Sequence, residues 1–309
     1  MTEIQKAAEL LRAGRLVAFP TETVYGLGAN ALDEAAVRRI FAAKGRPLTS
    51  PLIVHVASVE MARGLASEWP AKAERLARAF WPGPLTLVVP KAGCVPDLVT
   101  AGLGSVGLRM PAHPVALALL REAGVPVAAP SANRFTELSP TTAEHVRRAF
   151  SATEGGPEMI LDGGECAVGI ESTVLSLSGA RPRLLRPGMV TRAEIESLIG
   201  PVELGAGEGA AGESAEGEAT ESPGMHPKHY SPRTPVYLGE APKEGRGFRL
   251  SRDKMPGDAR GYARDLYRIL HKLDNDSYEW IWIELPPDEV EWAGVRDRLL
   301  RAANRNTGS

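Results

Sequence analysis

The sequence predicts an α/β protein in two domains: a twisted mixed sheet flanked by helices, then a second small parallel α/β domain. Short apolar runs alternate with amphipathic helical segments through residues 1–202, a pattern typical of a sheet covered by helices. Several successive runs have no helix between them, which favours a mixed sheet because parallel neighbours need a long crossover. A strand–helix–strand–helix series at residues 234–309 indicates the small parallel unit.

The predicted strands are apolar runs bounded by Gly, Pro or polar residues. In chain order they cover residues 15–19, 51–56, 85–90, 105–110, 125–129, 159–161, 173–177, 183–185, 235–238 and 278–285. The predicted helices repeat apolar residues three and four positions apart. They cover residues 59–69, 71–80, 113–122, 262–273 and 295–303, and others begin near residues 2, 33, 142 and 193. Three starts carry a capping box, at Thr2/Gln5, Thr141/Glu144 and Thr191/Glu194.

Residues 203–233 are predicted to be a flexible linker followed by a lid segment. Residues 203–221 consist largely of Gly, Ala and Glu without apolar periodicity, so they cannot bury enough surface to offset their ordering entropy. The stretch holds six Glu, which leaves the rest of the chain at +4 against −2 for the whole. A modest basic excess fits an anionic substrate and argues against a strongly basic nucleic-acid binder.

Composition indicates a globular protein of the cytoplasm. The 309 residues are 43% hydrophobic and 24% charged, and no apolar run approaches the ~20 residues that a membrane span needs. The two cysteines, Cys94 and Cys166, form no CxxC pair, which favours a reducing compartment. The N-terminus begins a polar helix, unlike a signal peptide.

A compact cationic fork at Lys44 and Arg46 is the first functional signal. Gly45 between them ends a predicted helix and Pro47 prevents its continuation, so both cations are expected to project from a rigid loop. Farther along the chain, residues 129–133 supply the Ser131 hydroxyl and the Asn133 amide on a second rigid turn. Cations beside neutral hydrogen-bonding groups suit a nucleoside polyphosphate. The pattern predicts an enzyme that binds ATP and transfers its adenylyl group.

Two common nucleotide-binding motifs do not apply. Residues 26–31 (GLGANA) resemble a GxGxxA fingerprint. The turn before them is too long, and the acidic residue expected about 20 positions later is missing. A P-loop ATPase is also excluded because no GxxxxGK[ST] occurs.

Several long motifs occur together in a fixed order. They are FPTETVYGLG (19–28), KGRP (44–47), PLIVHV (51–56), WPGPLT (81–86), VGLRMP (106–111), APSAN (129–133), LDGG (161–164), GIESTV (169–174), LRPG (185–188) and SPGMHPKHYSP (222–232). This set resembles the threonylcarbamoyl-AMP synthases, in the long form that joins a YrdC-like domain to a small Rossmann-like C-terminal domain. The resemblance covers nearly the whole chain.

The resemblance implies a reaction in which ATP, L-threonine and bicarbonate give threonylcarbamoyl-AMP and pyrophosphate. Mg²⁺ is implied as the cofactor, bound through the ATP phosphates, and no side chain is assigned as its ligand. The product is expected to pass to the proteins that modify tRNA, with at most weak contact to tRNA itself. Such a reaction asks mainly for positioning and charge neutralisation.

The resemblance also implies the residues of the site. The ATP-binding set is Lys44, Arg46, Ser50, Ser105, Ser131, Asn133, Ser139, Arg186 and Tyr230, with Tyr230 as a lid. The threonine-binding set is Thr23, His55, Arg109, Ala129 and Ser172. Within it, Arg109 suits the amino-acid carboxylate because a guanidinium fork matches two carboxylate oxygens. The chain departs from the family at Ser50, where Asn is usual, and at Ser105, where Thr is common.

Other interpretations stay open at this point. Each residue alone has a plainer role: Lys44 and Arg46 as helix-end cations, His55 as a core histidine, Arg109 and Arg186 as ordinary salt-bridge partners. The spacing of His226 and His229 suits a metal, but no third ligand is near. The rival functions are an RNA-binding module without catalysis and a carbamoyl-adenylate former that uses carbamoyl phosphate.

Overall fold

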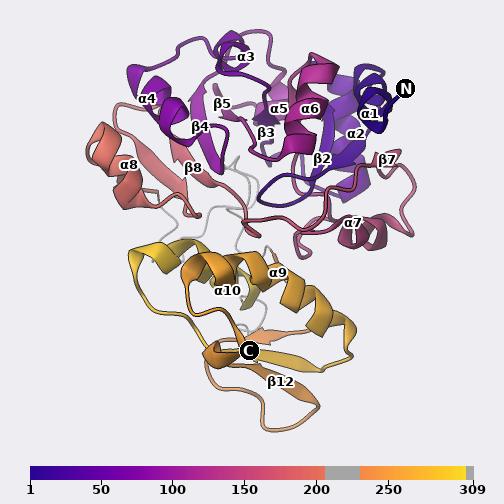
Figure 1. Ribbon diagram of the computed structural model, residues 1–309, viewed down its shortest axis with the longest axis vertical. Coiled ribbons are helices and arrows are strands. Elements are labelled where there is room, and N and C mark those ends of the chain that lie inside the picture. Colours follow the sequence, from indigo (N-terminus) through magenta and orange to yellow (C-terminus); the bar gives the residue numbers. More distant parts are fainter. Residues whose placement is uncertain (206–229, 304–309) are drawn as a thin grey trace.

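The computed structural model of the protein describes residues 1–205 and 230–303, in two bodies stacked one above the other (Figure 1). The larger body is built on a 10-stranded sheet with the order β10-β9-β8-β4-β5-β3-β6-β2-β1-β7. The sheet is mixed, since β3 pairs with β5 in parallel and β4 pairs with β5 antiparallel. Its strands are β1 (Val17–Phe19), β2 (Gly26–Asn30), β3 (Ile53–His55), β4 (Leu85–Pro90), β5 (Ser105–Arg109), β6 (Val127–Ala128), β7 (Met159–Ile160), β8 (Thr173–Ser176), β9 (Arg183–Arg186) and β10 (Glu203–Leu204).

Helices cover one face of this sheet along most of its length. Their core includes alternate residues of β4, namely Leu85, Leu87 and Val89. The covering helices are α2 (Glu34–Lys44), α3 (Val59–Gly64), α4 (Ala71–Phe80), α5 (Asp97–Thr100), α7 (Ala143–Phe150) and α8 (Arg192–Ile199). On the opposite face, α1 (Glu3–Arg12) and α6 (Pro114–Ala123) cover only the end around β1 and β6. The rest of that face carries Ile53 of β3, which borders the candidate site.

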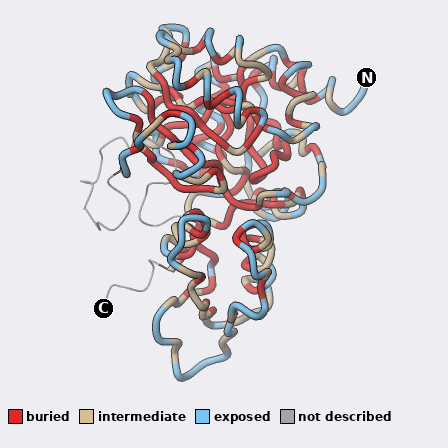
Figure 2. The backbone as a smooth tube through the Cα atoms, turned by 60° about the vertical axis from the view of Figure 1, so that its left-hand side comes forward, coloured by how far each residue is buried: buried red, intermediate tan, exposed pale blue. Residues whose placement is uncertain are grey.

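The smaller body is a parallel three-stranded sheet in the order β11-β13-β12. Its strands are β11 (Val236–Tyr237), β12 (Gly247–Leu250) and β13 (Trp280–Ile283), with short 3₁₀ turns η1 (Arg252–Lys254) and η2 (Val290–Trp292). Helices α9 (Ala259–Asn275) and α10 (Ala293–Ala303) lie between the two sheets (Figure 1). Figure 2 shows buried residues gathered in the large sheet and on the helices of the smaller body. Both sheets confirm the predicted fold class.

The two bodies share one apolar cluster. Val24, Leu138 and Ile170 of the larger body pack with residues of α9 such as Tyr262 and Leu266, and all five are buried. Burial of apolar surface contributes about 25 cal/mol of stability for each Å² removed from water. The smaller body is therefore docked through a continuous core.

Glycine contacts bring the two backbones close. A Cβ built on Gly294 of α10 would lie 2.9 Å from the Cα of Gly188, and one built on Gly169 would lie 2.5 Å from the carbonyl oxygen of Ala263 in α9. Real Cβ atoms do not approach other heavy atoms so closely. Both helices of the smaller body thus touch the larger one backbone to backbone.

Gly169→Ala is expected to weaken the contact with α9. Gly169 and Gly164 both have a φ of +81°, but a Cβ on Gly164 would have no heavy atom within 4 Å. Gly164→Ala is therefore a matched control that carries the backbone strain alone. Because a methyl group must push α9 away, we expect Gly169→Ala to lose about 1–3 kcal/mol more of the free energy of unfolding than Gly164→Ala. Chemical denaturation measures both, and equal losses would contradict the tight contact.

The structure corrects two strand assignments. The segment Gly26–Asn30, considered only as a loop, forms β2 between β1 and β6. Gly residues are poor strand formers on their own, but Gly28 leaves room for the ring of Phe19, which lies 2.8 Å from a Cβ built there. Strand β12 was also not predicted. Local propensity gave no signal for either strand, and pairing with neighbours decides both.

Two of the three predicted capping boxes, at Thr2 and Thr191, form as expected. The helix near residue 142 is capped by Thr142, whose hydroxyl accepts from the amide of His145, and not by Thr141. Glu203 and its neighbour pair with β9, so the large sheet continues past residue 202. The rest of the predicted linker at 206–229, with both histidines considered for metal, lies outside the described residues.

Candidate active site

A cavity of about 50 Å³ lies on the open part of the sheet's second face, beneath Tyr230. Elements far apart in the chain supply its walls, including β3, β5 and β9. The site residues predicted from the sequence that line it are Thr23, Arg46, His55, Arg109, Ala129, Ser131, Ser172, Arg186 and Tyr230. Three guanidinium groups thus converge on one buried cavity. Such a concentration of positive charge suits a substrate with several negative charges.

Arg46 and Arg186 form one side of the cavity. Both are buried. Arg46 donates from Nη2 to the carbonyl of Pro51 at 3.0 Å. Burial and the nearby charge of Arg186 lower the pKa of Arg46, partly offset by Tyr230, to about 10, so Arg46 remains charged at neutral pH. Arg186 donates from Nε to the carbonyl of Ser172 at 3.1 Å and from Nη2 to its hydroxyl at 3.2 Å.

Arg109 also lines the cavity and is held by a carboxylate. Its Nη2 lies 2.7 Å from Oε1 of Glu22 in an ion pair whose two side chains are 4% and 9% exposed. Nη1 donates to the hydroxyl of Thr23 at 2.9 Å, and Nε donates to the carbonyl of Gly83 at 3.2 Å. A guanidinium has five N–H donors, so these contacts leave donors for a substrate carboxylate.

His55 lies beside Arg109 and is kept neutral. Burial, together with the charge of Arg109, lowers the pKa of His55 to about 3. Its Nδ1 is buried and has no hydrogen-bond partner among the residues that the structure describes. His55 therefore lines the cavity as a neutral imidazole.

Lys44 differs from its predicted placement. It is the last residue of α2, Gly45 caps the helix with a φ of 62°, and the Lys44 side chain does not line the cavity. Its Nζ donates to the carbonyls of Ser131 at 2.6 Å and Asn133 at 2.5 Å. Burial, with the charge of Arg46, lowers the pKa of Lys44 well below its usual range. Lys44 therefore links the end of α2 to the loop that carries Ser131 and Asn133.

Lys44→Met is expected to destabilise the protein as well as to reduce its activity. The change leaves the buried carbonyl of Asn133 and the half-buried carbonyl of Ser131 without their donor, and each unsatisfied group costs up to about 1–3 kcal/mol. Urea denaturation should show a loss of about 2–6 kcal/mol in the free energy of unfolding. Lys6→Met, at an exposed position of α1, is the control and should change little. Unchanged stability of Lys44→Met would contradict an anchoring role.

Four further predicted residues lie outside the cavity wall. Asn133 donates to the carbonyls of Arg134 and Glu137 and so shapes its own loop. Ser139 is buried and donates to Oε1 of Glu171 at 2.5 Å. Two serines complete the group: Ser50, whose carbonyl accepts from Arg46, and Ser105, which lines a separate small cavity with residues of β3, β4, β5 and β8.

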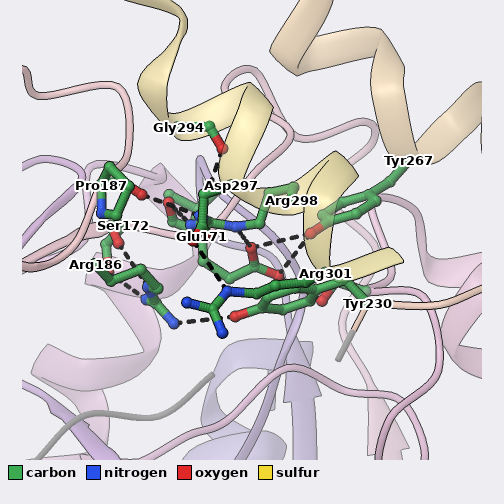
Figure 3. A network of polar contacts seen from close by, with 12 residues as sticks. Glu171, Ser172, Arg186, Pro187, Tyr230, Tyr267, Gly294, Asp297, Arg298 and Arg301 are labelled. Carbon is green, nitrogen blue, oxygen red and sulfur yellow. Dashed lines mark hydrogen bonds and ion pairs between the residues drawn. The ribbon is translucent and has the colours of Figure 1, made fainter. Parts of the chain in front are cut away.

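Tyr230 closes the cavity from the side of the smaller body. Its side chain is almost fully buried and its backbone has a φ of +61°. Its hydroxyl accepts from Nη1 of Arg186 at 3.3 Å. The guanidinium of Arg298 lies over the ring of Tyr230, 5.3 Å from the ring centre (Figure 3). A left-handed backbone at a non-glycine residue costs about 1–3 kcal/mol, so the surrounding contacts hold Tyr230 in place.

Sequence reasoning missed the two buried carboxylates, Glu22 and Glu171, and the arginine that faces the second of them. Glu171 lines the cavity, and its Oε2 lies 2.7 Å from Nε of Arg298 (Figure 3). The quoted motifs contain both glutamates, FPTETVYGLG and GIESTV. Their charge inside otherwise uncharged motifs was the available signal. Arg298 carried no such signal because it sits in an ordinary helical pattern.

Protein side chains around the cavity do not form a metal site. Over residues 1–205 and 230–303, no group of three or more His, Cys, Asp or Glu could hold an ion. Glu171, the carboxylate in the wall, already accepts hydrogen bonds from Arg298, Ser139 and Tyr267.

Over the same described residues, no helix is long and apolar enough to cross a membrane.

Comparisons with known proteins agree with this architecture. The Sua5/YciO/YrdC family model, described as telomere recombination, matches residues 9–188. The model described as the threonylcarbamoyl-AMP synthase C-terminal domain matches residues 190–304.

Individual relatives share both domains. The threonylcarbamoyl-AMP synthase of Bacillus subtilis is 41% identical over 97% of this chain and 93% of its own. That of Pyrococcus abyssi is 51% identical over 78% of this chain and 69% of its own. The crystal structure of P. abyssi Sua5 complexed with L-threonine has a TM-score of 0.89 and 42% identity, covering 97% of this chain and 94% of that one. The chain therefore belongs to the threonylcarbamoyl-AMP synthase family, in its two-domain form.

Proposed function

We propose that the protein forms threonylcarbamoyl-AMP and pyrophosphate from ATP, L-threonine and bicarbonate, as a nucleotidyltransferase. One observation carries the proposal: Arg46, Arg186 and Ser131 share a single cavity with Arg109 and His55. The first three suit a triphosphate, and the last two suit an amino acid. The P. abyssi relative crystallised with L-threonine supports the choice of amino acid.

The proposed reaction needs no protein nucleophile. The threonine amine attacks the carbon of bicarbonate, so a C–N bond forms, a C–O bond breaks and water leaves with the amine proton, giving a carbamate; with CO₂ only the amine proton is lost, to solvent. A carbamate oxygen then attacks the α-phosphorus, a new P–O bond forms, and the bond to pyrophosphate breaks. The charge that develops on the phosphates is the part of this step that a protein can stabilise. Arg46 and Arg186 are the candidates for that task because both are buried in the wall and Arg46 remains charged.

Threonine is proposed to bind with its carboxylate on Arg109. Glu22 and Thr23 hold this guanidinium in one orientation, which reduces the entropy lost on binding. The neutral ring of His55 lines the same cavity and is proposed to contact the bound amino acid. Ala129 and Ser172 complete the proposed threonine site.

Tyr230 is proposed to act as a lid. The cavity of about 50 Å³ is far smaller than the roughly 300–1,000 Å³ of typical ligand sites. Tyr230 must therefore move aside before ATP enters, while the smaller body stays docked through α9 and α10. The return of Tyr230 would exclude water from the product, an acyl-phosphate anhydride that hydrolyses readily. The contact between Tyr230 and Arg186 is the one that arriving phosphates would replace.

Mg²⁺ is proposed to arrive with ATP, held by the phosphates. The side chains of the cavity fit this arrangement better than a protein-bound ion because Glu171 already has three partners. The product is proposed to pass to proteins that transfer the threonylcarbamoyl group to tRNA. A cytoplasmic location would suit that role.

The test is pyrophosphate release from ATP with each of the 20 amino acids in turn. Release with threonine alone, and only when bicarbonate is present, is the expected result. Release with carbamoyl phosphate in place of threonine and bicarbonate would overturn the proposal. So would salt-sensitive RNA binding without any pyrophosphate release.

A further inference from the structure

We propose that Arg298, on helix α10 of the smaller body, is a positioning residue for the adenylyl-transfer site. It fixes the spacing of the two segments that carry Ser172 and Arg186, and it neutralises Glu171 next to the place of the phosphates. This inference rests on the proposed function. It gives the smaller body a role in building the site, separate from the lid role of Tyr230.

The first support is the reach of one guanidinium. Arg298 donates from Nη2 to the carbonyl of Glu171 at 3.2 Å and from Nη1 to the carbonyl of Pro187 at 3.0 Å. Glu171 directly precedes Ser172, and Pro187 directly follows Arg186. Arg298 therefore links the residue before Ser172 to the residue after Arg186 (Figure 3). Both Ser172 and Arg186 line the cavity.

The second support is the charge of Glu171. A buried carboxylate in the wall of a triphosphate site would repel the substrate unless it is paired. Its Oε2 accepts from Nε of Arg298 at 2.7 Å and from the hydroxyl of Tyr267 at 3.1 Å, and its Oε1 accepts from Ser139. The side chain of Arg298 is 0% exposed. Glu171 is thus paired inside the protein, and its partner Arg298 comes from the other body.

The pKa of Glu171 follows from the same contacts. Burial alone raises it. The charges of Arg298 and Arg186, with hydrogen bonds from Ser139 and Arg298, outweigh burial and lower the pKa below its ordinary value. The groups that face Glu171 are these two arginines and the phenols of Tyr230 and Tyr267. Arg298 is the largest of the lowering causes, so its loss should raise the pKa of Glu171.

Helix α10 is itself held rigidly against the site. Asp297 pairs with Nη1 of Arg298 at 2.7 Å and with Nε of Arg301 at 3.0 Å. Gly294, one turn earlier, touches the backbone of Gly188. A guanidinium that is planar, fully buried and fixed at its base loses little further freedom when it orients its partners. This is the geometry expected of a positioning group.

The experiment compares pyrophosphate release by the full chain and four variants, from about pH 6 to about pH 9. In Arg298→Met, the carboxylate of Glu171 loses its partner, so the KM for ATP should rise at least about tenfold at the alkaline end. Activity should recover as the pH falls through the raised pKa of Glu171, because protonation removes the repulsion. Adding Glu171→Gln should restore much of the ATP KM and flatten that profile.

Arg298→Lys separates the two parts of the role and serves if Arg298→Met does not fold. Lysine keeps the charge but cannot reach both carbonyls with one planar fork. We expect its ATP KM to stay within about threefold of the wild type while kcat falls at least about tenfold. Lower melting temperatures with unchanged kcat, KM and pH profile in these variants would overturn the proposal.

Arg296→Met is the matched control. Arg296 lies on the same helix, but it contacts Asp288 and Pro286 within the smaller body, so its loss should leave activity unchanged. If the wild type and Arg296→Met release no pyrophosphate with threonine, the proposed function fails. If they do and Arg298 variants match them, only the role of Arg298 fails.

Discussion

Arg46→Ala is expected to lower kcat/KM for threonine-dependent pyrophosphate release by about 100- to 1,000-fold. Arg46 is a charged guanidinium buried in the cavity wall, with a pKa of about 10. Removing a fixed donor from a developing negative charge in a water-excluded site costs about 2.7–4 kcal/mol of transition-state stabilisation. Kinetics at varied ATP and threonine concentrations would measure the loss.

The protein should remain folded in this variant. The hydrogen bonds of Arg46 reach carbonyls of its own loop, at Ser50 and Pro51, so its loss affects a short segment. Arg38→Ala on the neighbouring helix is the control, because Arg38 is 62% exposed and pairs only weakly with Glu34 at 3.7 Å. Full activity of Arg46→Ala, with a native circular dichroism spectrum, would contradict the phosphate assignment.

Local sequence signals predicted most of the fold. The helix at 71–80 and the strand at 85–90 have the predicted bounds, because amphipathic and apolar patterns are strong there. The ends of other elements moved by one to a few residues, as frayed ends commonly do. Strand β2 was not predicted, because its Gly-rich sequence forms a strand only by pairing with β1 and β6.

The candidate site was predicted in part. Motif order identified nine residues that the fold brings to one cavity. The sequence does not predict in which direction a side chain points. Lys44 and Arg46 are two positions apart, yet Lys44 links α2 to the loop of Ser131 and Arg46 lines the cavity. Buried charge partners were also beyond reach. Arg298 meets Glu171 across the two bodies, and no local pattern links residues so distant in sequence.

Arg109→Met is expected to raise the KM for threonine by about 100-fold or more, since a bidentate charged contact is lost. It should also destabilise the protein by about 3–5 kcal/mol, because Glu22 is left buried without its partner. These two effects have different causes. The 2.7 Å ion pair to Glu22 serves stability, whereas the proposed threonine contact depends on the position of Arg109 in the cavity wall.

A second substitution separates the two effects. Glu22→Gln combined with Arg109→Met removes both buried charges, so much of the stability should return. The KM for threonine should stay high, because no fork is present to bind the carboxylate. Arg109→Lys should fall between, keeping the charge opposite Glu22 but losing the bidentate geometry. Denaturation curves and threonine titrations on the same preparations measure both quantities. If the double variant regained its threonine KM along with its stability, Arg109 would act only by holding the fold, and the carboxylate of threonine would have to bind elsewhere in the cavity.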